Sequence, residues 1–261
     1  NPVTGSGGML IGRIRLIGPA HPAASSLRPG DRIATLVSLT LTPLHLDSID
    51  RVHVDNDRVD VKGHAILFAS GVWAKLPDDM ADTLALAALD VCGAPALVQR
   101  AVKPGQTVLV LGSGKSGALC CAQAKDNGAR VLALDISQKA VDTSVALGIA
   151  DEGLVADATK PVEVMEKVLA ATGGKLCDVV INCASVPRTE MASILSVRDR
   201  GTVVFFSMAT SFTATALGSE GVGKDADLLV GNGFAHGHAE LTLDLLRKHP
   251  KLREHFESRF A

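Results

Sequence analysis

TVLVLGSGKSG, at residues 107–117, is the stretch of sequence that decides the fold. Its first five residues are β-branched or apolar, a composition that predicts a buried strand. The glycines at 112, 114 and 117 let the chain turn tightly, let a pyrophosphate approach the backbone and let a helix pack on the strand. Free N–H groups at the start of that helix would face the phosphates. We therefore expect a dinucleotide to bind at Gly112, Ser113, Gly114, Lys115, Ser116 and Gly117.

Asp135 extends this prediction to the choice of cofactor. It follows a predicted strand at 129–134 and lies 18 residues after Gly117. That separation is close to the ~20 residues expected between a glycine loop and the carboxylate that binds the adenosine ribose. A carboxylate there accepts hydrogen bonds from both ribose hydroxyls and repels a 2′-phosphate. The sequence therefore predicts NAD in preference to NADP.

The segment GSGKS also resembles the phosphate loop of nucleoside triphosphatases, which requires the pattern G-x-x-x-x-G-K-[ST]. If Lys115 were the lysine of that pattern, the first glycine would stand at position 109. Position 109 is Leu109, inside the predicted strand. A triphosphatase is therefore strongly disfavoured.

The region from residue 107 onward alternates short apolar strands with helices. Strands are predicted at 107–111, 129–134, 178–181, 202–206 and 227–230, with a weaker one at 153–155. Helices are predicted at 116–127, 138–147, 161–171 and 189–196. Right-handed crossovers between such strands give an α/β fold with a doubly wound parallel sheet of the Rossmann type.

The first hundred residues have a different composition, dense in Gly and Pro. Apolar runs at 9–17 and 33–41, separated by a turn at 28–31, predict antiparallel β structure. A helix predicted at 82–97 leads into the α/β region. The stretch 238–258 is also predicted to be helical, with a kink or a break at Pro250.

Composition excludes several classes of function. The 261 residues include seven Phe and one Trp but no Tyr, which excludes any mechanism with a tyrosine acid, including that of the short-chain dehydrogenases. A net charge of −2 without a basic block disfavours nucleic-acid binding. Asp90 interrupts the best apolar run, so no run reaches the ~18–20 residues of a membrane span. Five cysteines without a CxxC favour a reduced, cytoplasmic setting over a disulfide framework.

Several features together resemble the medium-chain dehydrogenase/reductase superfamily: the Pro-Gly-Asp turn at 29–31, the linking helix, Lys103-Pro-Gly-x-Thr-Val and the glycine loop. Longer blocks, spread over essentially the whole chain, are similar to the family of L-erythro-3,5-diaminohexanoate dehydrogenases of anaerobic lysine fermentation. These blocks are NPVTGSGGMLIG (1–12), ATLVSLTLTPL (34–44), LALAALDVCGAPA (84–96), FFSMATSFTATALGSEGVGKD (205–225), VGNG (230–233) and GHAELTL (237–243). The resemblance implies a GroES-like β-rich catalytic domain at 1–94, lacking its N-terminal part. It also implies a Rossmann NAD-binding domain with a C-terminal helix at 95–261.

The resemblance further implies NAD-dependent oxidative deamination of the diamino acid at C3, giving 5-amino-3-oxohexanoate, ammonia and NADH. The substrate ammonium, with a pKa of about 10 if lysine is the guide, must lose a proton before hydride leaves, so a base is required. Candidates for the base and for ammonium ligands are Asp90, Glu190 and Glu220, expected near the carboxyl ends of the strands. Arg188 or Lys224 would meet the substrate carboxylate. For each of these five residues, an ordinary surface charge is an equally open interpretation.

Further cofactor contacts are expected where other strands end. Cys183, Ala184, Ser207 and Met208 would contact the nicotinamide end through their backbone. Asp157, after the weak strand, would lie near the adenine.

Zinc-dependent members of the superfamily carry Gly-His-Glu where this chain has Gly5-Ser6-Gly7, and Cys92 alone matches a ligand position. One remaining ligand does not make a site, so we expect no catalytic metal. Two alternatives stay open: a zinc-free quinone or enoyl reductase of the same superfamily, and a catalytically silent dinucleotide-binding subunit. The expected partner is a small diamino acid, not nucleic acid or a membrane. We also expect the protein to form a homo-oligomer, most simply a dimer.

Overall fold

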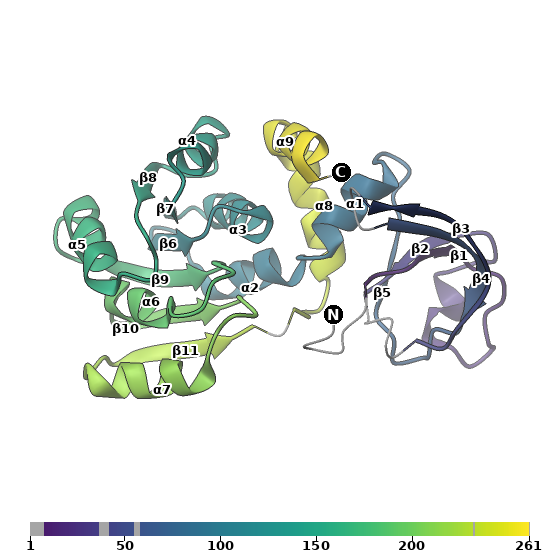
Figure 1. The fold of residues 1–261 in the computed structure, drawn as a ribbon, viewed down its shortest axis with the longest axis horizontal. Coiled ribbons are helices and arrows are strands. Elements are labelled where there is room, and N and C mark those ends of the chain that lie inside the picture. The colour runs from purple at the N-terminus through teal and green to yellow at the C-terminus, as the bar shows by residue number, and fades with distance from the viewer. Residues whose placement is uncertain (1–7, 37–41, 55–57, 232, 261) are drawn as a thin grey trace. The chain divides into compact units, whose positions relative to one another are not determined.

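The computed structural model describes residues 8–36, 42–54, 58–231 and 233–260 (Figure 1). The chain divides into two compact units, Asn1–Leu86 and Ala87–Ala261. The division falls inside helix α1 (Asp82–Leu89), whereas the boundary proposed from the sequence, between residues 94 and 95, lies within helix α2 (Gly93–Ala101). All candidate site residues belong to the second unit.

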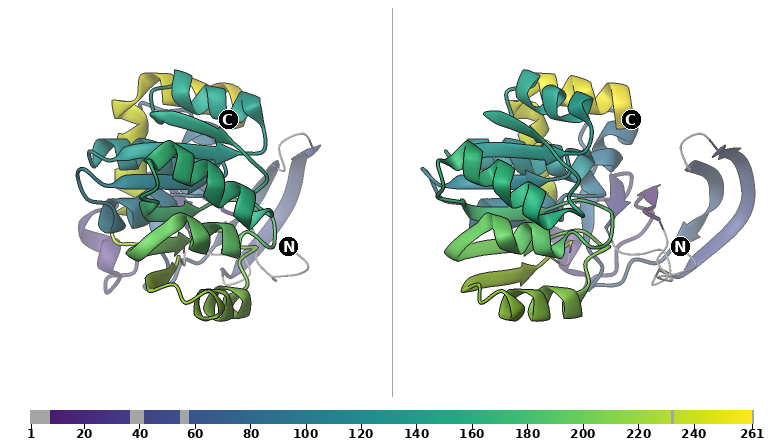
Figure 2. Two further views of the ribbon diagram at one scale, coloured as in Figure 1. Left: turned by 90° about the vertical axis from the view of Figure 1, so that its left-hand side faces the viewer. Right: turned by 60° about the vertical axis from the view of Figure 1, so that its left-hand side comes forward.

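A six-stranded parallel sheet forms the centre of the second unit (Figures 1 and 2). Strand β6 (Thr107–Leu111) lies between β7 (Arg130–Asp135) and β9 (Cys177–Asn182). Strand β8 (Glu152–Val155) continues the sheet beyond β7, and β10 (Val197–Phe205) and β11 (Ala226–Val230) continue it beyond β9. Every neighbouring pair is parallel. The doubly wound sheet predicted from the sequence is therefore confirmed.

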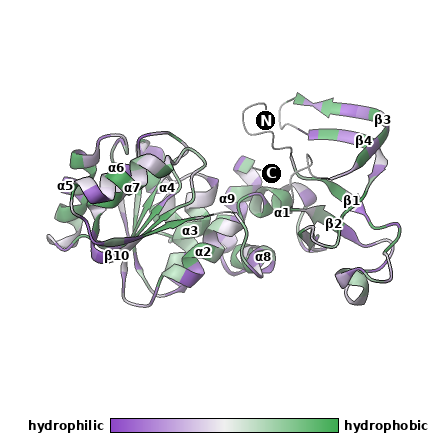
Figure 3. Cartoon of the chain, turned by 90° about the horizontal axis from the view of Figure 1, so that it is seen from below, coloured by the Kyte–Doolittle hydropathy of each residue, from purple (hydrophilic) through white to green (hydrophobic). Residues whose placement is uncertain are grey.

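Helices cover both faces of this sheet and bury its central strands β6, β7 and β9. Leu109, Leu132 and Phe205 are among the buried side chains that form one continuous core across the strands. Helices α5, α6 and α7 contact one another in series, and α2, α3 and α8 form a second group; the two groups lie on either side of the sheet in Figure 3. Burial on both faces explains why the strands are continuously apolar instead of alternating. The bounds of these helices are α3 Lys115–Asp126, α4 Gln138–Ala146, α5 Pro161–Thr172, α6 Glu190–Ser196, α7 Phe212–Gly221, α8 His238–Lys248 and α9 Pro250–Phe260.

The single helix predicted at 82–97 was wrong, because α1 ends at Leu89 and α2 begins at Gly93. Pro95 supplies the physical reason. In a continuous helix its ring would clash with the carbonyl of Val91, whereas in α2 it stands in the first turn, where no N–H is needed. Close packing adds to the break, since a Cβ atom on Gly93 would overlap the backbone of Gly233.

One further prediction about helices is confirmed, and one helix was not predicted. The break expected at Pro250 is confirmed, since α8 ends at Lys248 and α9 begins at Pro250. Helix α7 was not predicted, because FTATALGSEG contains β-branched residues and glycines that are typical of strands and loops. Ser211 starts this helix by accepting a hydrogen bond from the N–H of Ala214.

The first unit is rich in β structure. Strands β1 (Ile11–Arg13), β2 (Arg32–Thr35) and β5 (Trp73–Lys75) form a three-stranded antiparallel sheet. A short 3₁₀ helix, η1 (Pro22–Ser25), lies between β1 and β2. The turn predicted at 28–31 is present: the N–H of Arg28 donates to Asp31 Oδ2 at 2.8 Å, and Gly30 has φ +95°. Residues 37–41 of the second predicted strand lie outside the described residues.

Strands β3 (Leu44–His53) and β4 (Arg58–Ala65) form a separate curved antiparallel hairpin (Figure 2). The register pairs Ile49 with Val61 and Val52 with Val59, so one face of the hairpin is apolar. All four of these side chains are exposed. The opposite face pairs charged and histidine side chains.

Within the residues that the structure describes, no single helix is long and apolar enough to cross a membrane. The bent pair of α1 and α2 meets the criteria of length and composition together.

Candidate active site

The order of the strands places a crevice at the carboxyl ends of β6 and β9. From β6 the chain continues to β7 and β8 on one side, then crosses back to β9 on the other side. Helices on opposite faces therefore diverge above these two neighbouring strands. Gly112 follows β6 and Cys183 follows β9, and the N–H of Cys183 donates to the carbonyl of Leu111 at 2.8 Å. The glycine loop thus lies at the position where open α/β sheets bind ligands.

The three glycines of the loop have different roles. Gly112 has φ +89°, and a Cβ atom there would lie 3.0 Å from Cα and N of Ala184. A Cβ atom on Gly117 would overlap the carbonyl oxygen of Gly112. A Cβ atom on Gly114, the residue that caps α3, would meet nothing within 4 Å. The loop therefore packs tightly beneath but stays open above the N-terminus of α3, which is the space that a pyrophosphate needs.

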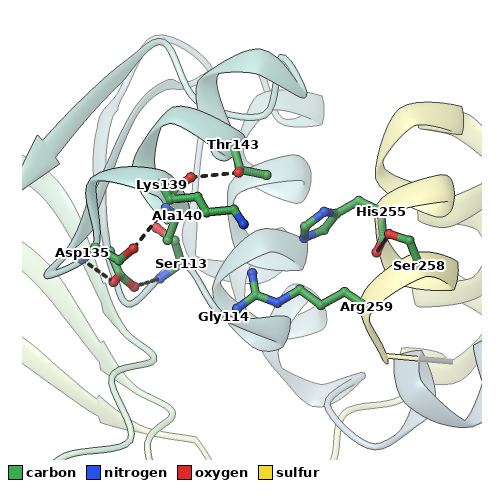
Figure 4. A pocket seen from close by; sticks show the side chains of 10 residues that line it. Ser113, Gly114, Asp135, Lys139, Ala140, Thr143, His255, Ser258 and Arg259 are labelled. Carbon is green, nitrogen blue, oxygen red and sulfur yellow. Dashed lines mark hydrogen bonds between the residues drawn. The ribbon is translucent and has the colours of Figure 1, made fainter.

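Asp135 is held in position by the backbone. Its Oδ2 accepts from the N–H of Ser113 at 2.8 Å, and its Oδ1 accepts from the N–H of Ser137 at 2.9 Å. The carboxylate borders a cavity of about 570 Å³ that also includes Gly114 (Figure 4). Its two oxygens have further lone pairs with which to accept hydroxyl donors.

Three cationic or basic side chains line the same cavity, and the sequence analysis missed them. Lys139 comes from the first turn of α4, and His255 and Arg259 come from α9 (Figure 4). Burial, followed by the charge of Arg259, holds the pKa of His255 below its usual range. The available signal was the spacing of His255, in the predicted helix 238–258, and Arg259, which directly follows it. Nothing in the sequence indicated that this helix would reach Asp135.

Asp90 and Lys115 form an ion pair that joins two groups of predicted residues. Lys115 Nζ lies 2.6 Å from Asp90 Oδ2. Lys115 is the first residue of α3, and Asp90 directly follows α1. The structure therefore places a carboxylate that already binds a primary ammonium beside the glycine loop.

Glu190 is only 3% exposed, and its partner is a backbone group. Its Oε1 accepts from the N–H of Ser211 at 2.7 Å. Because Ser211 caps α7, this bond fixes the end of the segment between β10 and α7, which contains Ser207 and Met208. The geometry gives Glu190 a positioning role.

Asn182, which the sequence analysis did not select, organises the ends of β9 and β10. It is fully buried, and its Nδ2 donates to Thr189 Oγ1 at 2.9 Å and to Ser193 Oγ at 3.0 Å. Its Oδ1 accepts from the N–H of Ala184, and its backbone carbonyl accepts from the N–H groups of Phe206 and Ser207. A polar residue closing the apolar strand DVVIN was the signal for this role.

Of the residues predicted to contact the nicotinamide, Cys183 and Ala184 lie beside the glycine loop. Cys183 is 7% exposed and Ala184 is half-buried beside Gly112, whereas the Met208 side chain is 89% exposed. Ser207 Oγ accepts from the N–H of Ala209. These residues follow β9 and β10, the two strands joined by Asn182.

Asp157 and Arg188 lie near each other beyond β8 and β9. Hydrogen bonds from the backbone and hydroxyl of Thr159 lower the pKa of Asp157, and the Arg188 charge contributes last. Asp157 thus initiates the turn before α5. Asp157 is not among the residues that line the cavity.

Glu220 and Lys224 lie away from the crevice. Glu220 is exposed in the last turn of α7, and Lys224 precedes β11. Since α7 connects two parallel strands, its last turn lies toward the opposite edge of the sheet from the glycine loop. The structure therefore does not bring these two residues together with Asp90 and Glu190.

Comparison with known proteins agrees with this geometry. Residues 1–77 match the family described as L-erythro-3,5-diaminohexanoate dehydrogenase N-terminal domain, and residues 116–218 match the zinc-binding dehydrogenase family. The L-erythro-3,5-diaminohexanoate dehydrogenase of Acetoanaerobium sticklandii is 54% identical over all of this chain and 77% of its own length. The enzyme of that name from Fusobacterium nucleatum is 51% identical over 98% of this chain and 75% of its own length. This chain belongs to the L-erythro-3,5-diaminohexanoate dehydrogenase family. It is an oxidoreductase that uses a nicotinamide dinucleotide.

Solved structures agree on the fold of this family member. A mycobacterial protein complexed with NADPH superposes with a TM-score of 0.65 at 21% identity, over 98% of this chain and 72% of its own. An alcohol dehydrogenase from Thermotoga maritima gives 0.66 at 16% identity, over 94% and 73%. Both confirm the medium-chain dehydrogenase fold.

The position that corresponds to a zinc ligand in some members of the superfamily is a buried thiol here. Burial raises the pKa of Cys92 to about 12. The carbonyl of Cys92 accepts from Thr242 Oγ1 at 3.3 Å. Gly5-Ser6-Gly7, the other segment used in the metal prediction, lies outside the described residues, so the absence of a catalytic metal stays a prediction.

Proposed function

We propose that the protein catalyses NAD-dependent oxidative deamination of L-erythro-3,5-diaminohexanoate to 5-amino-3-oxohexanoate and ammonia, in lysine fermentation. The observation that carries the proposal is 54% identity, over the whole chain, to the Acetoanaerobium sticklandii enzyme of that name. Overall, the substrate in its ammonium form, water and NAD⁺ give the ketone, ammonium, NADH and one proton. Two electrons and one proton leave C3 together as hydride.

NAD in preference to NADP is supported by Asp135. Its carboxylate is oriented by Ser113 and Ser137 and borders the cavity next to the glycine loop. Two ribose hydroxyls would donate to it, whereas a 2′-phosphate would be repelled. The N-terminus of α3 and Lys115 would hold the pyrophosphate. When bound there, the nicotinamide accepts the hydride from substrate C3.

Asp90 is the best candidate for binding a substrate ammonium group. It already binds one such group, the Nζ of Lys115, at 2.6 Å. If the pyrophosphate attracts Lys115, Asp90 becomes available to accept a proton from the substrate ammonium at Oδ2 or to orient it. Removal of that proton leaves the free amine, whose lone pair assists the departure of hydride.

Glu190 and Asn182 support the reaction by fixing backbone. Glu190 holds Ser211, and Asn182 holds Ala184, Phe206 and Ser207. These bonds keep the ends of β9 and β10 in one arrangement, which we propose contacts the nicotinamide through Cys183, Ala184, Ser207 and Met208. Asp157 is proposed to lie beside the adenine, and Arg188 to meet the substrate carboxylate.

A cytoplasmic location and a homodimer complete the proposal. All five cysteines are free and buried, which suits a reducing compartment. Strand β11 is at one edge of its sheet and exposes Leu229 and Val230, a surface that a second copy would cover. Light scattering of the full-length protein measures the oligomeric state.

Coupled assays on the full-length protein test the reaction. With 3,5-diaminohexanoate and NAD, one ammonia should appear for each NADH. Lysine carries its amino groups at C2 and C6, so it presents no amine-bearing C3 and should be a poor substrate. NADH without ammonia, or no turnover despite tight NAD binding, would refute the assignment. Reduction of a quinone or enoyl substrate instead would establish the alternative reductase activity.

A further inference from the structure

Two buried thiols are in contact beneath the glycine loop. Cys120 belongs to α3, Cys183 follows β9, and their Sγ atoms lie 3.7 Å apart. Cys120 is fully buried and Cys183 is 7% exposed. The proposed reaction uses neither thiol.

The two cysteines belong to the two elements that form the crevice. Helix α3 begins at the glycine loop, one turn before Cys120. Cys183 is anchored by its N–H bond to Leu111 and is followed by Ala184, which packs against Gly112. A covalent bond between the sulfur atoms would therefore tie the helix that faces the phosphates to the strand end beside it.

The distance between the sulfur atoms allows such a bond after a small movement. A disulfide has an S–S length of about 2.05 Å, so the two atoms must approach by about 1.7 Å. The backbone of Ala184 packs closely against Gly112, since a Cβ atom added to Gly112 would lie 3.0 Å from Cα of Ala184. Moving Cys183 toward α3 would move Ala184 relative to the loop.

We propose that Cys120 and Cys183 are a site of reversible disulfide modification, through which a peroxide lowers the affinity of the protein for the dinucleotide. The sulfur of Cys183, the more exposed of the two, attacks one peroxide oxygen, and the O–O bond breaks to give a sulfenic acid and water. The sulfur of Cys120 then displaces the hydroxyl group, which leaves with the Cys120 proton as a second water. The two thiols lose two electrons, and the peroxide gains them.

Burial sets the conditions for this modification. Burial first, and then the hydrogen bond with Cys183, raises the pKa of the Cys120 thiol well above its usual range. Because peroxide has little access to the pair and few thiolates form, the oxidation should be slow. Since a bound dinucleotide would cover the loop above the thiols, it should slow the oxidation.

The test uses the wild-type protein in native buffer with hydrogen peroxide. After alkylation and digestion, mass spectrometry should find a peptide that links Cys120 to Cys183, with two fewer free thiols than the five of the reduced chain. Fluorescence titration should show NADH affinity reduced at least about tenfold, with recovery after dithiothreitol. Saturating NADH during the exposure should delay both changes.

Cys121 provides a matched control, since it is the next residue on α3 and is also fully buried. Cys121→Ala should form the linked peptide as the wild type does, whereas Cys120→Ala should not. Cys183→Ser is the second variant, and a cooperative thermal unfolding transition of the reduced form of each variant shows that it is folded. The proposal is overturned if the link forms only in denatured protein, if linked protein binds NADH normally, or if Cys120→Ala loses affinity as much as the wild type. Because only dinucleotide binding is needed, these results do not depend on the proposed substrate.

Discussion

Asp135 is the residue on which the preference for NAD should depend, and its replacement by alanine removes both carboxylate oxygens from the cavity. Hydrogen bonds to charged groups contribute about 1.5–3 kcal/mol each. Losing two ribose hydrogen bonds should therefore weaken NADH binding by at least about 100-fold. We expect the Asp135→Ala variant to show this loss while the glycine loop continues to bind the pyrophosphate.

The same substitution should strengthen NADPH binding. A carboxylate about 5 Å from a phosphate, at an effective dielectric constant of about 20, repels each unit of phosphate charge by about 3 kcal/mol before salt screening. Removing it gains on the order of 100-fold in affinity at low salt. Lys139, His255 and Arg259 already line the cavity and would offer cationic partners to the 2′-phosphate.

Fluorescence titration with NADH and NADPH, at low and at high salt, measures both effects. Asp142→Ala is the control, because Asp142 lies on α4 outside the cavity lining and bonds only locally, to Gln138 Nε2. Thermal unfolding of both variants is recorded as well, since Asp135 also holds the N–H groups of Ser113 and Ser137. Equal affinities of the wild type for the two cofactors, or an equal loss of both in Asp135→Ala, would refute the reasoning.

Four further predictions concern the site and stability. Asp90→Asn should lower kcat at least about tenfold by removing a charged ammonium ligand, with NADH affinity changed much less; a normal steady-state rate would reject Asp90. Glu190→Ala should lower turnover because it removes the acceptor that holds the Ser211 N–H, and Glu220→Ala should not. Equal rates in both variants, measured with ammonia and NADH assays, would discard the positioning role. Burial lowers the pKa of His238 below 6.5, so the folded state binds a proton less readily than the unfolded state. The free energy of unfolding should therefore fall as the pH drops below 6.5, and it should fall less in His238→Gln. Thermal melts between pH 5 and 8 measure both changes. Activity should survive treatment with a chelator. The prediction of a metal-free site would be overturned if elemental analysis found stoichiometric zinc bound through Cys92 and activity were lost on its removal.

The glycine loop and its sheet were predictable because the signals are local. The strand at 107–111 and the helix that follows it are indicated by composition and by the spacing of three glycines, although Gly112 packs against the distant Ala184. Asp135 was also predictable, since one strand–helix–strand repeat has a nearly constant length. The glycine loop and Asp135 are thus predictable from the chain between residues 107 and 135 alone.

Other features depend on contacts between distant segments, which the sequence does not display. The approach of His255 to Asp135 joins residues 120 positions apart. The burial of Glu190 depends on Ser211 in another element. The hairpin of β3 and β4 was missed for a different reason: register shifts between Leu46 and Ser48, and between Ile49 and Arg51, break the alternation that identifies a strand.

Helix α9 has a consequence for the order of events during synthesis. The glycine loop and Asp135 emerge from the ribosome long before His255 and Arg259, which form the opposite wall of the cavity. Leu252 and Phe256 are fully buried, so α9 docks as part of the core. A nascent chain that stops before residue 250 has the glycine loop but lacks the wall of the cavity that His255 and Arg259 form. We therefore expect dinucleotide binding, and the stabilisation that comes with it, to strengthen once α9 has been synthesised and has docked.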